Sequence, residues 1–101
     1  MLQAQIFIDK NEFVGGQPLH EFIMQFLIKQ QIKGATAFTG SSGYMDNSPL
    51  KRPFELFSFD EIPLLITFID EADKVTQTLN ALRAITPVGF IVVHEVQIWN
   101  S

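Results

Sequence analysis

The order in which two hydrophobic periodicities follow one another constrains the fold of this chain more than any other feature. A period of two, typical of a strand, opens the sequence, because polar residues separate Leu2, Ala4, Ile6 and Ile8. A period near 3.6, typical of an amphipathic helix, follows the Gly15-Gly16 break. Its apolar stripe consists of Leu19, Phe22, Ile23, Phe26 and Leu27.

The ends of this first helix are indicated by a proline and a glycine. Pro18 suits the first helical position, because its missing N–H would have no partner there. Lys29 and Lys33 favour the negative C-terminal end of the helix dipole. We expect Gly34 to adopt the left-handed conformation that stops the helix.

The second half of the chain repeats the pattern. Residues 35–39 are predicted to form a short strand closed by Gly40, and Pro63 opens a third strand over residues 64–69. Asp70 is predicted to cap a second helix, which ends before Pro87 and Gly89. Its apolar stripe consists of Ala72, Val75, Leu79, Leu82 and Ile85. Residues 90–99 are predicted to form a long final strand.

The resulting order is strand, helix, strand, strand, helix, strand. It predicts an α+β protein with the ferredoxin-like βαββαβ fold, a four-stranded antiparallel sheet with two helices on one face. The chain has 101 residues, which suits one domain, and we expect a single domain over residues 1–101.

The face of the sheet that the helices leave uncovered is predicted to be apolar. The third strand is apolar on both sides, with Leu64, Ile66 and Phe68 on one and Leu65 and Ile69 on the other. The final strand has the same character, with Phe90, Val92, Val96 and Ile98 on one side and Ile91, Val93 and Trp99 on the other. An antiparallel sheet with one face in water alternates more cleanly. We therefore expect another subunit to cover this face.

Composition excludes several classes of function. A net charge of −4 disfavours nucleic-acid binding, and the absence of cysteine excludes disulfides and thiolate metal sites. The N-terminus has neither the charged nor the apolar region of a signal peptide, and the run 62–69 is too short to span a bilayer. These features predict a cytoplasmic protein without stable membrane insertion.

The segment between Gly40 and Pro63, about residues 41–62, shows no periodicity. Connections longer than about 12–15 residues without regular structure are uncommon and usually functional or disordered. Backbone N–H groups and hydroxyls in the run Gly40, Ser41, Ser42 and Gly43 can hold an anion. Lys51 and Arg52 can reach its charge, and Tyr44 can stack on a ring. Composition leaves open the alternative of a simple mobile connector.

An ordered set of short pieces resembles the PII-like signalling proteins, specifically an uncharacterised bacterial and archaeal branch. The pieces extend from about Ile6 to Trp99. They are Gly16-Gln17-Pro18-Leu19, Gly34-Ala35-Thr36, Gly40-Ser41-Ser42-Gly43-Tyr44, Asp60-Glu61-Ile62-Pro63, Ile69-Asp70 and Gly89. The chain departs from the branch at Thr39 and Met45, where an arginine and a glycine are common.

The resemblance implies a ferredoxin-like subunit in a homotrimer whose sheets face inward. It also implies a mobile T-loop that contacts an unknown protein partner through residues 45–58, and adenine nucleotides bound between subunits near the base of the loop. The implied function is a non-enzymatic sensor of a small anionic ligand, with no required cofactor. The ligand-binding residues we expect on this basis, together with the charges noted above, are Gly40, Ser41, Ser42, Gly43, Tyr44, Lys51, Arg52 and Gly89.

Two other functions are compatible with the same fold. A cofactor-free isomerase or monooxygenase would need His20 or His94 as a base in a closed pocket. A metal-tolerance protein of the CutA type would need clustered ligands, and this chain has no cysteine and only two histidines. We expect neither a catalytic residue nor a metal site, since a lone histidine in a strand is usually structural.

Overall fold

The computed structural model describes residues 1–41 and 62–100. Its main elements are β1 (Leu2–Asp9), α1 (Leu19–Lys29), β4 (Ala35–Thr39), β5 (Pro63–Asp70), α2 (Ala72–Ile85) and β6 (Phe90–Glu95). A small hairpin, β2 (Phe13–Val14) and β3 (Gln17–Pro18), lies between β1 and α1. The two-residue turn Gly15-Gly16 has positive φ at both positions, which this type of tight hairpin requires.

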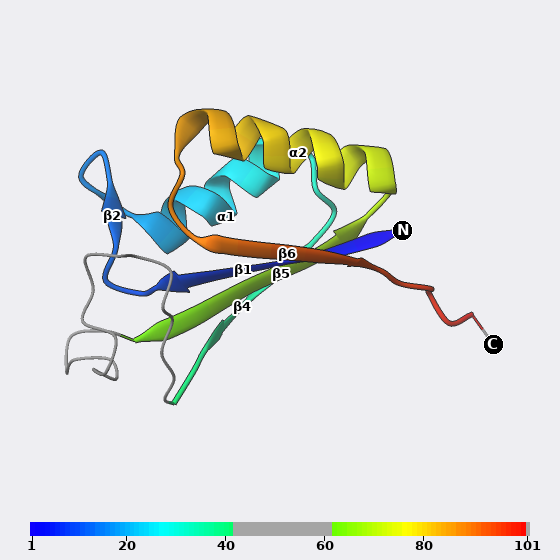
Figure 1. The fold of residues 1–101 in the computed structure, drawn as a ribbon, viewed down its shortest axis with the longest axis horizontal. Helices are drawn as coiled ribbons and strands as arrows, with labels where there is room; N and C mark the ends of the chain where they lie inside the picture. The colour runs from blue at the N-terminus through cyan, green and yellow to red at the C-terminus, as the bar shows by residue number, and fades with distance from the viewer. Residues whose placement is uncertain (42–61, 101) are drawn as a thin grey trace.

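The four long strands form one antiparallel sheet in the order β4-β5-β1-β6. Both helices pack on the same side of it, and the opposite side carries neither (Figure 1). This arrangement confirms the predicted α+β, ferredoxin-like βαββαβ class.

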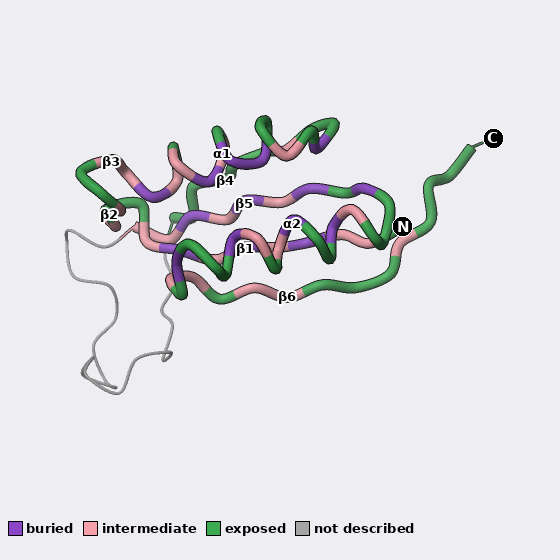
Figure 2. Tube along the Cα trace, turned by 90° about the horizontal axis from the view of Figure 1, so that it is seen from above, coloured by how far each residue is buried: buried purple, intermediate pink, exposed green. Residues whose placement is uncertain are grey.

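The core lies between the helices and the two central strands. Ala4, Ile6 and Ile8 of β1 alternate with less buried residues and face Phe68, Ile66 and Leu64 of β5 across the sheet. Burial is high along β1 and β5 and low along the tail after β6 (Figure 2). Each fully buried aliphatic side chain contributes about 1.5–3 kcal/mol, so this layer provides much of the stability of the fold. From α1 and α2 it receives Leu19, Ile23, Phe26, Leu27, Val75 and Leu82.

The prediction for the end of the first helix was wrong. Gln31, not Gly34, takes the left-handed conformation, with φ of 64°. The Ile32 N–H donates to the Leu27 carbonyl at 3.1 Å and the Gln31 N–H to the Ile28 carbonyl at 2.9 Å, which is the Schellman pattern. Ending the helix early lets Ile32 enter the core at 8% exposure, and this burial offsets the strain at Gln31. At the other end, Pro18 precedes the helix and closes β3.

The prediction for the second helix was right in position and wrong in detail. Glu71, not Asp70, occupies the N-cap position, while the Asp70 carboxylate accepts the backbone N–H of Glu71 at 2.8 Å. The buried stripe runs through Val75, Thr78 and Leu82. Leu79 is only partly buried, and Ala72 and Ile85 are exposed. Thr78 occupies the core-facing position because spacing on the helix decides burial, whatever the side chain.

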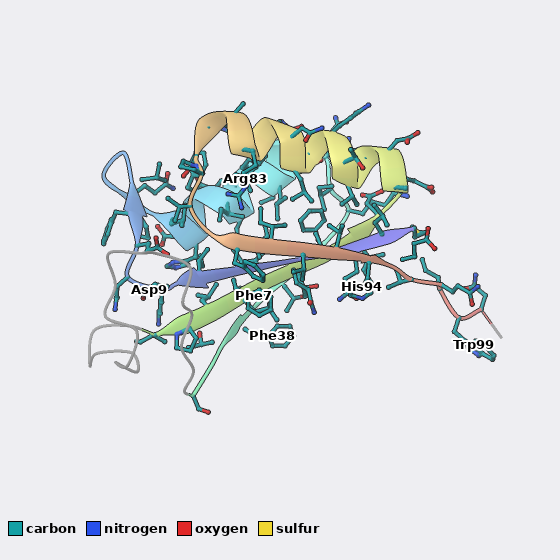
Figure 3. The ribbon with its side chains drawn as sticks, viewed as in Figure 1. Phe7, Asp9, Phe38, Arg83, His94 and Trp99 are labelled. Carbon is teal, nitrogen blue, oxygen red and sulfur yellow. The ribbon has the colours of Figure 1, made fainter. Side chains whose placement is uncertain are left out.

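The final strand is shorter than predicted. It ends at Glu95, and one further backbone bond joins the Val96 N–H to the Met1 carbonyl at 3.1 Å. β1 offers no partner beyond its first residues, so the tail leaves the sheet there. Trp99 is consequently 87% exposed (Figure 3).

The open face of the sheet carries a row of apolar side chains. Residues paired across neighbouring strands lie on the same side of a sheet, and the register pairs Phe38 with Leu65, Leu65 with Phe7, and Phe7 with Phe90. Figure 3 shows Phe7 and Phe38 on the side away from the helices. The ring centroids of Phe7 and Phe90 are 6.2 Å apart, and Phe38 and Phe90 are about half exposed. We call Phe38, Leu65, Phe7 and Phe90, three phenylalanines and the leucine between two of them, the aromatic row. The expected apolar character of the second face is confirmed for this end of the sheet only, because Gln3, Thr67 and His94 lie on the same face toward the other end.

Candidate functional site

Gly40 follows the last residue of β4 and is in close contact with Pro63, the first residue of β5. Its N–H donates to the Pro63 carbonyl at 2.8 Å. A Cβ added at Gly40 would lie 2.9 Å from Cγ of Pro63, closer than side chains approach each other in practice. This contact requires glycine, and it fixes the two chain ends that flank residues 42–61.

Asp9, the last residue of β1, secures the same end of the sheet. Its Oδ1 accepts the backbone N–H of Asn11 at 3.0 Å and that of Ile62 at 3.1 Å (Figure 3 labels Asp9). The Lys10 N–H donates to the Ile62 carbonyl at 2.7 Å. One carboxylate therefore holds the turn after β1 and the entry to β5 together. Sequence reasoning missed Asp9, although an aspartate at the end of a strand commonly accepts the N–H two residues on.

Gly89 precedes β6 and lies close to the core. Its φ is 98°, a conformation that side chains other than glycine rarely adopt. An added Cβ would lie 3.1 Å from Cγ2 of Ile8 and 3.5 Å from Cγ2 of Ile6. The turn before it is stabilised by the Thr86 hydroxyl, which accepts the Val88 N–H at 3.2 Å. The conformation of the turn from Thr86 to Gly89 is thus fixed by packing against the core and by a side-chain hydrogen bond.

Arg83, in the last turn of α2, reaches over this turn (Figure 3). Its Nη2 donates to the Gly89 carbonyl at 2.7 Å, and its Nη1 donates to the Val88 carbonyl at 2.9 Å and to the Thr86 carbonyl at 3.4 Å. Sequence reasoning also missed Arg83. The available signal was a basic residue near a helix C-terminus, where such side chains bond terminal carbonyls.

The predicted ligand-binding residues fall at one end of the sheet but at its two edges. Gly40 and Ser41 follow β4, and Gly89 precedes β6. Antiparallel pairing brings these positions to the same end, while the strand order places three strand spacings between them. At about 4.8 Å per spacing, the two edges are roughly 14 Å apart. Ser42, Gly43, Tyr44, Lys51 and Arg52 lie outside the described residues, as does the segment 45–58.

The two histidines are not brought together. His94 is exposed on the open face, where it pairs with Gln3, whereas His20 lies in the first turn of α1 on the covered side (Figure 3 labels His94). The buried Nδ1 of His20 has no hydrogen-bond partner within the described part of the chain. In residues 1–41 and 62–100, no three His, Cys, Asp or Glu side chains are grouped to hold a metal ion. The helices of these ranges are too short or too polar to cross a membrane.

Comparison with known proteins gives one family and a set of structural neighbours. The model of the DUF190 family, described as Uncharacterized ACR, matches residues 1–98. CPII from Thiomonas intermedia K12, bound to ADP, AMP and acetate, has a TM-score of 0.67 and 20% identity, covering 98% of this chain and 88% of CPII.

Two further structures resemble the chain. The first is a second structure of CPII, described as a nitrogen regulatory PII-like protein, bound to ADP, AMP and bicarbonate. It has a TM-score of 0.62 and 18% identity, and the match covers 99% of this chain and 93% of that one. GlnK of B. subtilis has a TM-score of 0.54 and 17% identity, and the match covers 94% of this chain and 83% of GlnK. At these identities the neighbours establish the fold.

Proposed function

The chain belongs to the DUF190 family, which is PII-like, and from this membership we propose that it is a non-enzymatic sensor of a small ligand. In this proposal the ligand is an adenine nucleotide. Binding changes the state of the segment between β4 and β5, and another protein reads that state. No cofactor is required.

The placement of Gly40 and Gly89 at the same end of the sheet is the observation that carries the proposal. Neither position carries a side chain, at Gly40 because Pro63 leaves no room for one and at Gly89 because of its positive φ. The Gly40 N–H already donates to the Pro63 carbonyl, so the amides proposed to bind the ligand are those that follow Gly40 and that of Gly89. Exposed backbone N–H groups in such turns bind phosphate oxygens. The structural neighbour CPII is itself described as bound to ADP and AMP, which supports an adenine nucleotide as the first ligand to test.

We propose further that the protein is a homotrimer. The aromatic row is the reason, because two of its phenylalanines are about half exposed and contiguous apolar surface marks sites of interaction with other chains. Gly40 and Gly89 lie at opposite edges of a subunit, so a closed ring can bring the β4 edge of one copy to the β6 edge of the next. A ligand between copies then contacts both glycine turns.

In the assembled site the ligand is held by Gly40, Ser41, Ser42, Gly43, Tyr44, Lys51, Arg52 and Gly89. The backbone N–H groups and hydroxyls that follow Gly40 bind phosphate, the two basic side chains neutralise its charge, and the tyrosine ring stacks on the base. Residues 45–58 contact the protein partner. Of this set, only Gly40, Ser41 and Gly89 belong to the described residues.

Native mass spectrometry and calorimetry test this proposal. Native spectra of freshly purified protein should show a trimer that retains nucleotide. Calorimetric titration with ATP, ADP and AMP should show binding, and the double variant Lys51→Ala, Arg52→Ala should weaken it with little change in thermal stability. If none of the three nucleotides binds at millimolar concentration, the nucleotide proposal fails.

A further inference from the structure

We propose that Arg83 is a positioning residue that holds the turn from Thr86 to Gly89 in the shape required for the nucleotide. This inference rests on the proposed function, since it assigns a task to a residue beside the Gly89 turn. Arg83 acts through the backbone of the turn and does not itself neutralise the ligand.

The geometry of the guanidinium is the first support. Three carbonyl oxygens, those of Thr86, Val88 and Gly89, converge on Nη1 and Nη2 at 3.4, 2.9 and 2.7 Å. Converging carbonyl dipoles repel one another unless a cation lies between them. The planar fork of arginine supplies several N–H groups in a fixed arrangement, which a lysine cannot reproduce.

The turn itself is the second support. Gly89 has positive φ and lies against Ile8 and Ile6, so its backbone has little freedom to move toward the core. Pro87 has no N–H, and the N–H of Val88 is bonded to the Thr86 hydroxyl. Within positions 87–89, therefore, at most the Gly89 amide can donate to a phosphate. The direction of that amide depends on the adjoining carbonyls, which Arg83 fixes.

The hydrogen bonds of the Arg83 guanidinium are thus made to the protein backbone. The guanidinium is exposed and bonds three neutral carbonyls, so its stabilising effect on the whole fold is small. Its effect on the shape of the turn is larger, because no other side chain among the described residues is seen to bond these three oxygens.

Three variants separate positioning from direct ligand contact. Arg83→Met removes the charge and the fork, Arg83→Lys keeps the charge and loses the fork, and Lys33→Met is the matched control, removing one exposed charge at the opposite end of the sheet. The first readout is amide hydrogen exchange at Val88, Gly89 and Phe90 in the ligand-free protein. The second is calorimetric affinity for ADP at low and high salt.

We expect Arg83→Met and Arg83→Lys to accelerate exchange in the turn and to weaken ADP binding on the order of tenfold, the equivalent of about one net hydrogen bond. Both should keep the salt dependence of the wild-type protein, since neither loses a contact with the ligand's charge. Lys33→Met should match the wild-type protein in exchange at the turn.

Two results would overturn the inference. If Arg83→Lys binds ADP as tightly as the wild-type protein while Arg83→Met binds weakly with a reduced salt dependence, the arginine contacts the ligand directly. If both variants exchange and bind like the wild-type protein, Arg83 positions nothing. Should the wild-type protein bind no adenine nucleotide, the proposed function fails and the ligand role of Arg83 fails with it. The exchange rates then decide separately whether Arg83 orders the turn.

Discussion

The two faces of the sheet are formed by the same strands, but the side chains of only one face are covered by the helices of the chain. On the covered face, Ile6 and Ile66 pair with each other and are fully buried under the helices of their own chain. On the open face, their neighbours Phe7 and Leu65 pair with each other and are only partly buried. A single chain covers one face and leaves the other open, with the apolar side chains of the aromatic row at one end of it. The difference indicates that folding of the chain depends on one set of residues, and that the proposed assembly would depend on a separate set interleaved with it.

Substitution at adjacent positions of β5 should separate the two faces with the largest effect. Ile66→Ala removes a fully buried side chain, and we expect the free energy of unfolding to fall by about 2–5 kcal/mol at any protein concentration. Leu65→Ala should act mainly on assembly, so that its effect on thermal unfolding depends on protein concentration. A concentration-independent loss of equal size at both positions, measured by denaturant titration, would break the distinction.

Introducing a charge into the aromatic row sharpens the comparison further. Phe38→Glu should dissociate the proposed trimer and leave a folded subunit, because a charge at an apolar contact between copies would weaken association by roughly 2–4 kcal/mol. Analytical ultracentrifugation measures the mass, and far-ultraviolet circular dichroism measures the fold. The control Asn80→Glu places the same charge on an exposed position of α2 and should change neither.

Substitution of Gly89 tests how tightly the turn before β6 packs against the edge of the covered face. Gly89→Ala forces a side chain into positive φ and against Ile8, so we expect a loss of about 1–2 kcal/mol in unfolding free energy. Gly34→Ala is the matched control, since nothing lies within 4 Å of the position that its Cβ would take. Equal stability of the two variants in urea titration would show that the turn before β6 adapts freely.

The smallest effect is expected from the histidine on the open face. His94→Gln should change the free energy of unfolding by less than about 0.5 kcal/mol and leave nucleotide binding intact, because the side chain is exposed in the single chain and lies at the end of β6 away from the aromatic row. His20→Gln should likewise spare nucleotide binding. A substrate whose turnover collapses with either substitution would replace the sensor proposal with an enzyme.

Periodicity along the chain was enough to predict the four long strands, the two helices and the face of the sheet that the helices cover. Residues 35–39 form the predicted strand, and the stripe of α1 is buried as expected, with Phe22 packed beside it. Periodicity is a local property that each segment carries in its own side chains. The hairpin Phe13–Pro18 was missed although its Gly-Gly turn signal was present, because strands of two residues are too short to show a period.

The helix ends and the site needed information from distant parts of the chain. The stop of α1 depends on the burial of Ile32 in a core that the other elements complete. The separation of Gly40 from Gly89 follows from the strand order β4-β5-β1-β6, which no local pattern encodes. The contacts of Asp9 with Ile62 and of Gly40 with Pro63 join residues far apart in the sequence. These features arise from packing, so composition and spacing alone did not reveal them.

The mass of the protein in solution tests the central claim most directly. We propose that the aromatic row on the open face forms contacts between copies of the chain. Light scattering coupled to size-exclusion chromatography should therefore give about three times the 11.4 kDa chain mass at micromolar concentration. A stable species of 11.4 kDa under the same conditions would contradict the account, since it would show that the open face tolerates water.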